Sequence, residues 1–183
     1  MPESFFKSQS DIILLLEDDP DDQLIFQEMM DEINELLPPL KISETISEAE
    51  ALLESENVIA CFVDFRLGIE SGLEFIRNNA EQYSETSFIL LTGQGGLEVD
   101  EKALAFGAKD YLQKGEFGSH QLLRCLRYVT TQTRHEALMR SQRDHLHTLL
   151  NPMGEVLWIY NIADQKFEEI GTGIEFLTGH PPK

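Results

Sequence analysis

Acidic, hydroxyl and basic side chains follow four apolar segments of this sequence, and together they could carry out phosphoryl chemistry. Five carboxylates fill six positions over residues 17–22, and Asp64 stands alone directly after an apolar run. Thr92 and Lys114 follow two later segments. Crowded carboxylates repel one another unless a cation joins them, and Mg²⁺ is the hard divalent ion that accompanies phosphate chemistry. The hydroxyl and ammonium groups could bind phosphoryl oxygens, and Asp64 could be a nucleophile that forms an aspartyl phosphate.

Each of these side chains also has an ordinary structural role that the residues alone leave open. Acids at a helix start suit the positive end of the helix dipole, and an Asp or a Thr after a strand often belongs to a turn. A Lys is usually just exposed to solvent. Their order along the chain favours one common site, because each group follows a different apolar segment.

The apolar segments predict buried strands of a parallel sheet. Residues 12–16, 58–63 and 88–91 are continuously apolar, as in strands covered on both faces. Residues 40–46 contain polar members and predict an edge strand, and residues 110–112 predict a last short strand. Function in such sheets gathers at the carboxyl ends of the strands.

Segments of helical periodicity separate these strands and complete a doubly wound α/β domain. Ser47 is expected to cap a short helix that runs to Leu53. Two further helices are expected, one marked by Leu73, Ile76 and Ala80 and one over residues 97–106. The first helix should bury one apolar face and end at a proline pair: Ile25, Met29, Ile33 and Leu36, then Pro38 and Pro39.

The residues at these strand ends resemble the receiver domains of two-component response regulators. The resemblance extends from residue 11 to about residue 128, and residues 14–20, 63–68, 90–93 and 107–114 carry it. It implies a flavodoxin-like fold with five parallel strands in the order 2-1-3-4-5. It also implies Mg²⁺ as the cofactor, and a histidine kinase or a phosphotransfer protein as the phosphoryl donor.

The resemblance implies a role for each side chain of the site. Glu17 would reach the metal through a bound water, and Tyr111 would swing inward as Thr92 moves toward the phosphoryl group. From the residues alone, Tyr111 is only a strand aromatic that is expected to pack in the core. Proline usually follows the lysine in this family, so Gly115 predicts a looser loop. The implied residues are Asp64 as phosphoacceptor, Glu17, Asp18, Asp64 and the Arg66 backbone carbonyl at the metal, Thr92 and Lys114 at the phosphoryl group, and Thr92 and Tyr111 as the switch.

Residues 119–150 predict one long helix that differs in charge from the segment before it. Residues 1–118 hold 7 basic and 26 acidic residues, whereas residues 119–150 hold 5 and 2. We expect this helix to link the receiver to a downstream domain and to form a weak homodimer, and a single exposed helix is the alternative. One apolar set should pack on the sheet: Leu122, Leu126 and Val129. A second set should form a thin heptad seam: Met139, Leu146 and Leu149.

The last segment resembles the opening of a PAS domain, which often follows a receiver in multidomain sensor proteins. Residues 156–160 and 166–170 predict two strands, and a short helix is expected around Phe176. So few residues cannot close a core, so we expect the chain to stop inside a second domain. The expected domains are a receiver core over 1–118, a linker helix over 119–150 and a truncated PAS segment over 151–183.

Composition excludes several classes of function. The chain has 183 residues and a formal charge of −19, which argues against direct binding to nucleic acid or to an anionic membrane. Its apolar runs are too short to span a bilayer. Cys61 and Cys125 fit no metal spacing and are expected to be buried free thiols of a cytoplasmic protein.

These observations favour a phosphorelay module over an enzyme that acts on an external substrate. Such a receiver assists only its own phosphorylation and dephosphorylation. One alternative is a Mg²⁺-dependent phosphohydrolase with an Asp nucleophile, but those enzymes usually place a second acid two residues further on, where this chain has Arg66. Another is an inactive pseudo-receiver that serves only for docking, and the complete set of site residues argues against it.

Overall fold

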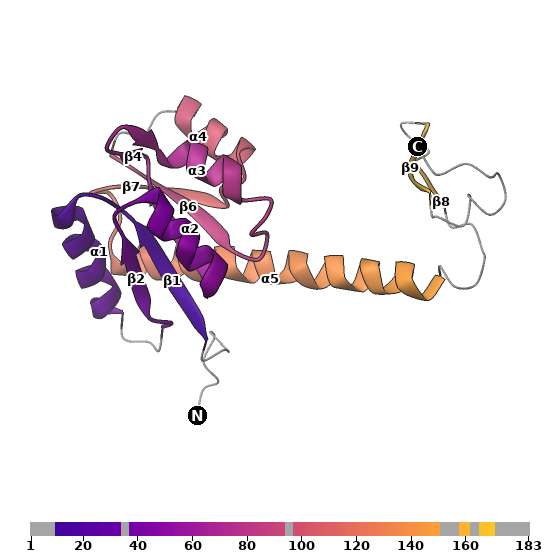
Figure 1. Cartoon of the computed structure of the whole chain (residues 1–183), viewed down its shortest axis with the longest axis horizontal. Helices are drawn as coiled ribbons and strands as arrows, with labels where there is room; N and C mark the ends of the chain where they lie inside the picture. Colours follow the sequence, from indigo (N-terminus) through magenta and orange to yellow (C-terminus); the bar gives the residue numbers. More distant parts are fainter. Residues whose placement is uncertain (1–9, 34–36, 94–96, 151–157, 162–164, 171–183) are drawn as a thin grey trace. The chain divides into compact units, whose positions relative to one another are not determined.

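A five-stranded parallel sheet with helices on both faces dominates the computed structural model (Figure 1). The chain divides into two compact units, Met1–His135 and Glu136–Lys183, and the sheet belongs to the first. The structure describes residues 10–33, 37–93, 97–150, 158–161 and 165–170.

All neighbouring strands of the sheet are parallel and follow the order β2-β1-β3-β6-β7. In order along the chain this is 2-1-3-4-5, so the predicted doubly wound topology is confirmed. The three inner strands are buried over almost their whole length, as their uninterrupted apolar sequence predicts. The strands are β1 (Asp11–Leu16), β2 (Leu40–Ser43), β3 (Asn57–Asp64), β6 (Ser87–Thr92) and β7 (Asp110–Gln113).

Two hydrophobic cores lie on opposite faces of the sheet, because alternate strand residues point to opposite sides. Ile12, Leu14 and Leu16 belong to one core, and Ile13 and Leu15 belong to the other. Helices α2, α3 and α4 cover the first core, and α1 and α5 cover the second. These helices are α1 (Pro20–Glu32), α2 (Ile46–Ser55), α3 (Gly72–Asn79), α4 (Leu97–Ala105) and α5 (Ser119–Leu150).

The predicted buried face of the first helix is confirmed in part, because Met29 and Ile33 pack against the core but Ile25 does not. Ile25 is half exposed, whereas Phe26 and Met30 are buried, and the Phe26 ring packs against the Phe62 ring with centroids 4.9 Å apart. Leu24, Ile25 and Phe26 are consecutive apolar residues, so helical periodicity alone allows the buried face to include either Ile25 or Phe26. The larger ring of Phe26 occupies the core. The helix also ends at Glu32, before the proline pair that was expected to end it, and Leu36 lies outside the described residues.

The cap of α2 also differs from the prediction. Thr45, not Ser47, is the N-cap, and its hydroxyl accepts a hydrogen bond from the Glu48 backbone N–H. The Glu48 side chain accepts in turn from the Glu44 backbone N–H. Because these cap residues leave the sheet early, β2 ends at Ser43 rather than at residue 46.

The predictions for α5 and for the two cysteines are largely confirmed. The helix has the expected bounds, and Leu122, Leu126 and Val129 are completely buried against the sheet. Cys61 and Cys125 are buried free thiols. Met139, the first position of the predicted seam, is 56% exposed, and the side chains of Leu146 and Leu149 lie outside the described residues.

In the second unit, two strands follow the end of α5. Strands β8 (Trp158–Asn161) and β9 (Lys166–Ile170) pair antiparallel, which confirms the predicted pair of strands; residues 156 and 157 of the first predicted strand lie outside the described residues. A hairpin alone does not identify a PAS domain, and the helix expected around Phe176 lies outside the described residues. Among the helices of the described segments, none has both the length and the apolar character that a membrane span requires.

Candidate functional site

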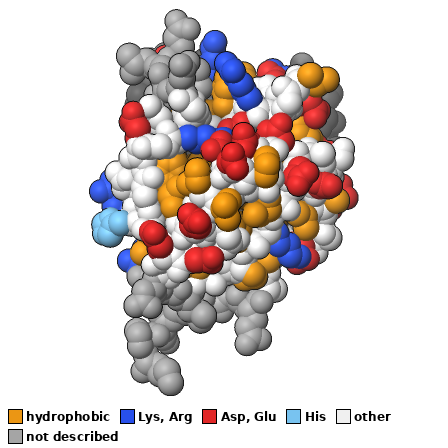
Figure 2. Space-filling view, turned by 90° about the vertical axis from the view of Figure 1, so that its left-hand side faces the viewer, with side chains coloured by type: hydrophobic (Ala, Val, Ile, Leu, Met, Phe, Trp, Pro, Cys, Tyr) orange, Lys and Arg blue, Asp and Glu red, His pale blue; other side chains and the backbone are white. Residues whose placement is uncertain are grey.

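The predicted site residues leave the sheet at one edge, where the strands have their carboxyl ends. The strand register brings these ends side by side, because Leu16 pairs with Val63 and Leu91 pairs with Asp64. Figure 2 faces this edge, and acidic side chains gather near its middle beside a basic one.

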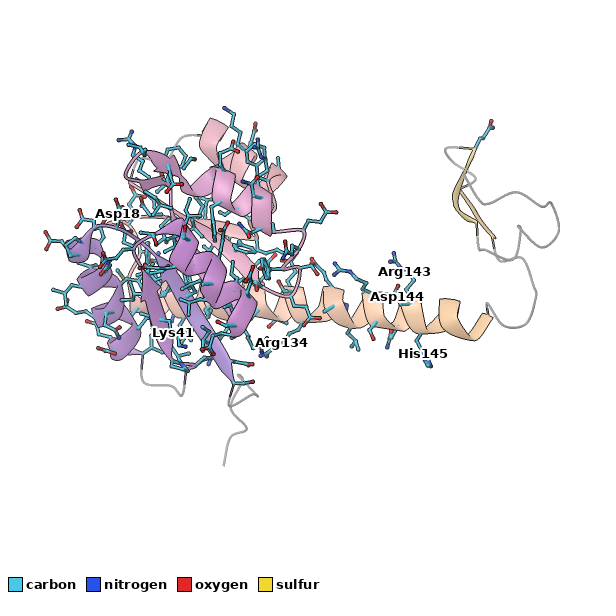
Figure 3. The ribbon with its side chains drawn as sticks, in the orientation of Figure 1. Asp18, Lys41, Arg134, Arg143, Asp144 and His145 are labelled. Atoms are coloured by element: carbon cyan, nitrogen blue, oxygen red, sulfur yellow. The ribbon has the colours of Figure 1, made fainter. Side chains whose placement is uncertain are left out.

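The opposite end of the sheet carries a different contact. Asp18 lies at the carboxyl edge, whereas Arg134 lies on α5 at the other end (Figure 3). There its guanidinium is 3.5 Å from the buried carboxylate of Asp11. The acids of the candidate site are therefore separated from this structural ion pair.

Three carboxylates at the edge could hold a cation. One oxygen from each of Glu17, Asp18 and Asp64 lies within 4.8 Å of the other two. Glu17 and Asp64 are buried, and Asp18 is exposed. Oxygen donors of this kind, with one ligand open to water, suit Mg²⁺, which keeps several of its water ligands. The donor set therefore fits the implied metal.

Burial changes the acidity of Glu17. Its pKa is raised from 4.5 to about 7, mainly by desolvation; the hydrogen bond to Lys114 lowers it and the negative charge of Asp64 adds to the rise. A carboxyl group with such a pKa is only partly compensated by the cationic side chain beside it. An additional cation at this position would favour the ionised form.

Lys114 is the cation beside this cluster, and it contacts three carboxylates. Its Nζ atom is 2.6 Å from Glu17 Oε2, 2.7 Å from Asp22 Oδ2 and 2.5 Å from Asp64 Oδ1. Burial alone would lower the pKa of Lys114, but the hydrogen bonds to Asp22, Asp64 and Glu17 outweigh burial and raise it. Lys114 is therefore a permanent positive charge at the end of β7.

The backbone around Asp64 is held on both sides. The Phe65 N–H donates to the Leu91 carbonyl, and the Gly72 N–H donates to the Phe65 carbonyl. The second carboxylate oxygen of Asp64 accepts a hydrogen bond of 2.7 Å from the Arg66 N–H. Asp64 thus presents its carboxylate in one fixed orientation.

A short hairpin next to Asp64 was not predicted. Strands β4 (Arg66–Leu67) and β5 (Glu70–Ser71) pair antiparallel, and Gly68 at their turn has φ of 59°. Segments of two residues carry too little periodicity to be found from sequence, although a glycine in a tight turn is a usual sign.

A cavity of about 570 Å³ beside Asp64 brings the predicted phosphoryl-binding residues together. Thr92 is buried, and its carbonyl accepts a hydrogen bond of 2.8 Å from the Lys114 N–H, so β6 and the segment after β7 are tied at the cavity. The predicted grouping of Asp64, Thr92 and Lys114 is thus present in the structure. The lining residues are Asp22, Asp64, Phe65, Arg66, Thr92, Gly93 and Lys114.

Tyr111 lies elsewhere, and its predicted core packing is wrong. Its side chain is 37% exposed, and it lines a separate surface pocket between β7 and α5. Strand β7 is the last in the sheet, so one side of it has no neighbouring strand to cover Tyr111.

Asp22 also lies at the site, although it was not among the predicted site residues. It stood among the five acids of residues 17–22, but only Glu17 and Asp18 were assigned to the site. Asp22 lies in the first turn of α1 and reaches both the cavity and Lys114. A weak signal existed, because Asp22 is an acid in the first turn of the helix that follows the acidic pair.

Gly115 gives the loop after Lys114 a path that a proline could not follow. Its φ is 81°, whereas the proline ring fixes φ near −65°. The departure from the family pattern at this position therefore changes the backbone, and not only the side chain.

Comparison with known proteins decides the family. The model of the response regulator receiver domain matches residues 13–127. The chain belongs to this family. The photosynthetic apparatus regulatory protein RegA of Rhodobacter capsulatus is 30% identical over 112 residues, which are 61% of this chain and 60% of RegA. The chain thus spans less than two thirds of that relative.

Solved structures agree with this receiver assignment. The signal receiver domain of an HD domain-containing protein from Pseudomonas fluorescens Pf-5 has a TM-score of 0.63 and 25% identity, with 72% of this chain and 95% of that one covered. A CheY-like receiver domain protein from Methanospirillum hungatei JF-1 has a TM-score of 0.61 at 22% identity, covers 70% of this chain and 99% of its own, and supports the fold alone.

Proposed function

We propose that this receiver domain accepts a phosphoryl group on Asp64 from the phosphohistidine of a kinase or a phosphotransfer protein. The observation that carries the proposal is the contact of Lys114 with Glu17 and Asp64 at the mouth of a cavity that Thr92 also lines. The cavity is large enough for a phosphoryl group. A nucleophile (Asp64), a hydroxyl group (Thr92) and an ammonium group (Lys114) line it together.

The chemistry follows from the position of Asp64. One of its carboxylate oxygens attacks phosphorus, the new P–O bond forms, and the P–N bond of the phosphohistidine breaks. The electron pair of the broken bond stays on the imidazole, which takes up a proton from solvent. Lys114 and Thr92 bind the phosphoryl oxygens, and a later attack by water returns Asp64 to its carboxylate form.

We propose that Asp18, Asp64 and the Arg66 carbonyl hold Mg²⁺, with Glu17 acting through a metal-bound water. When bound, the metal would neutralise charge on the carboxylates and on the phosphoryl oxygens. The buried Glu17 and the fixed Asp64 orient the ligand set, and exposed Asp18 leaves the site open to water.

For output, we propose that Thr92 and Tyr111 form the switch and that α5 relays the change to a downstream domain. Tyr111 is 37% exposed on β7, which pairs with the strand that ends at Thr92, so its ring would gain burial by turning inward. We propose the start of a PAS domain as that downstream domain, and an antiparallel hairpin such as β8–β9 is what such a start would place after α5.

Labelling with acetyl phosphate in the presence of Mg²⁺ tests the phosphoacceptor. Intact-mass and peptide mass spectrometry should find a single phosphoryl group on Asp64, and Asp64→Asn should abolish it. Asp21→Asn is the matched control, because it removes an exposed carboxylate from the same edge and should label normally. Labelling that persists in Asp64→Asn would contradict the assignment.

A further inference from the structure

We propose that Asp22 is a positioning residue that holds the Lys114 ammonium group and competes with the phosphoryl group for it. This inference rests on the proposed phosphoacceptor function and names a residue that lowers the affinity of that site for phosphoryl groups. It begins from the 2.7 Å contact between Asp22 Oδ2 and Lys114 Nζ, across 92 positions of the chain.

The donors of Lys114 are fully used in the structure. An ammonium group has three N–H donors, and three carboxylates, those of Glu17, Asp22 and Asp64, lie within 2.7 Å of Nζ. A phosphoryl oxygen can therefore bind Lys114 only if one of these carboxylates gives up its hydrogen bond. Each such bond is charge-assisted on both sides, so its loss has a measurable cost.

Asp22 is the partner that the chemistry can release. Asp64 must stay close because it carries the phosphoryl group, and Glu17 is buried beside the metal position. Asp22 lies at the outer side of the cavity and is 37% exposed, so water can solvate it once Lys114 leaves. The phosphoryl group would therefore displace Asp22 rather than the other two carboxylates.

The fold holds Asp22 in place for this contact. The Gln23 side-chain amide donates a hydrogen bond of 2.7 Å to the Glu17 carbonyl, which ties the start of α1 to the end of β1. An acid in the first turn of a helix is common because it suits the helix dipole. Asp21 would satisfy that ordinary role equally well and is exposed, so the reach of Asp22 to Lys114 needs its own explanation.

The test compares Asp22→Asn with Asp21→Asn in the full chain, with beryllofluoride and Mg²⁺ as the probe of phosphoryl affinity. Both variants remove one negative charge from the same turn, but only the first weakens a partner of Lys114. Asp22→Asn should bind beryllofluoride about three- to fivefold more tightly, the range expected for a partly exposed ion pair. Asp21→Asn should match wild type.

A second comparison separates action through Lys114 from simple repulsion of the probe. In a Lys114→Gln background, the added Asp22→Asn change should leave beryllofluoride affinity unaltered, since the residue through which Asp22 acts is gone. A persistent gain would mean direct repulsion and would overturn the proposal. Unchanged or weaker binding by the single Asp22→Asn variant would overturn it as well.

Water exchange of the Lys114 ammonium protons, measured by ¹⁵N NMR without any probe, decides the contact by itself. Exchange should be slow in wild type and in Asp21→Asn, and faster in Asp22→Asn. Equal exchange in all three would show that Asp22 does not hold Lys114. If wild type failed to bind beryllofluoride while this exchange difference remained, the phosphoacceptor function would be wrong, but the contact by which Asp22 holds Lys114 would be confirmed.

Discussion

At the scale of single residues, Glu17 and Asp64 are buried carboxylates that share one ammonium partner. Glu17 is 1% exposed, and burial raises its pKa to about 7 even though Lys114 lies 2.6 Å away. Lys114 neutralises only part of the negative charge of these two carboxylates. The pair therefore destabilises the metal-free fold and favours the binding of a further cation.

The raised pKa of Glu17 predicts a stability that depends on pH in metal-free buffer. The folded protein keeps a proton that the unfolded chain loses between its ordinary pKa of 4.5 and about 7. The contribution of Glu17 to the free energy of unfolding therefore falls as pH rises through that window. Glu17→Gln removes this loss, so its stability relative to wild type should rise by up to about 3 kcal/mol from the lower to the upper pH.

Urea unfolding at several pH values, with a chelator present, measures this difference. Glu48→Gln is a suitable control, because Glu48 is an exposed acid and is not among the carboxylates that contact Lys114. A constant difference between Glu17→Gln and wild type across the window would show that folding does not raise the pKa of Glu17.

Metal binding gives a second prediction at this scale. Asp18→Ala should weaken Mg²⁺ affinity at least tenfold, because Mg²⁺ uses few protein carboxylates and Asp18 is the exposed one of the three. Asp19→Ala, next to it but outside the cluster, is the control for lost charge. Titration calorimetry that found equal Mg²⁺ affinity in both variants would remove Asp18 from the site.

A site residue can be predicted from the sequence when its position follows from a strand end, but not when it depends on how the elements pack. Asp64, Thr92 and Lys114 could be predicted because each follows a strand, and strand ends of a parallel sheet meet at one edge. Asp22 could not, since the side chain that reaches Lys114 depends on how α1 is placed against β1. The core packing expected for Tyr111 was wrong because β7 is the edge strand of the sheet.

At the scale of elements, α3 begins directly on the backbone of the phosphoacceptor. A Cβ atom on Gly72, the first residue of α3, would lie 1.9 Å from the Asp64 carbonyl oxygen and 2.7 Å from Val63 Cγ1. The helix can therefore approach β3 this closely only with glycine at its start. The contact links the packing of α3 to the orientation of Asp64.

Gly72→Ala should accordingly destabilise the receiver by about 3 kcal/mol or more, because backbone atoms cannot move aside cheaply. Gly118→Ala is the matched control, since nothing lies within 4 Å of its Cβ position and a small change is expected. Urea unfolding of both variants checks the prediction. Equal stabilities would mean that α3 can shift away from β3 at little cost.

Elements with long apolar runs were predictable, and those decided by packing were not. The three inner strands followed from sequence because any register buries them. The buried face of α1 did not, since Ile25 and Phe26 are both apolar and only the contact with Phe62 selects the second. The two-residue strands β4 and β5 carry no periodic signal at all.

At the scale of the whole molecule, the acidic receiver is followed by a helix of opposite charge. The topology could be predicted from the alternation of strands and helices alone, because parallel strands need a crossover helix between them. What the helix does beyond residue 135, where the second unit begins, could not be predicted, since its apolar residues are sparse there. Leu138 and Met139 are each 56% exposed in a single copy of the chain.

These exposed residues lead to the last prediction, a weak dimer through α5. Met139 and Leu146 are seven residues apart, so they lie on one side of the helix and could pair with the same positions of a second copy. Gln132, His135 and Gln142 dilute this seam, so only a few apolar contacts gain from burial and the dimer should be marginal. In a marginal dimer, a change of a few kcal/mol on phosphorylation of the receiver is enough to shift the monomer–dimer equilibrium.

Sedimentation of wild type, Leu146→Glu and Ser141→Glu, an exposed control that lies off the seam, each with and without beryllofluoride, measures the shift. Beryllofluoride should change the dimer fraction of wild type and of the control, and Leu146→Glu should stay monomeric in both conditions, because a buried pair of glutamates would be strongly unfavourable. Amide exchange along residues 119–150 should change with the dimer fraction. A wild-type chain that is monomeric in both conditions, with unaltered exchange along the helix, would make α5 a passive connection and leave the output of this receiver to another surface.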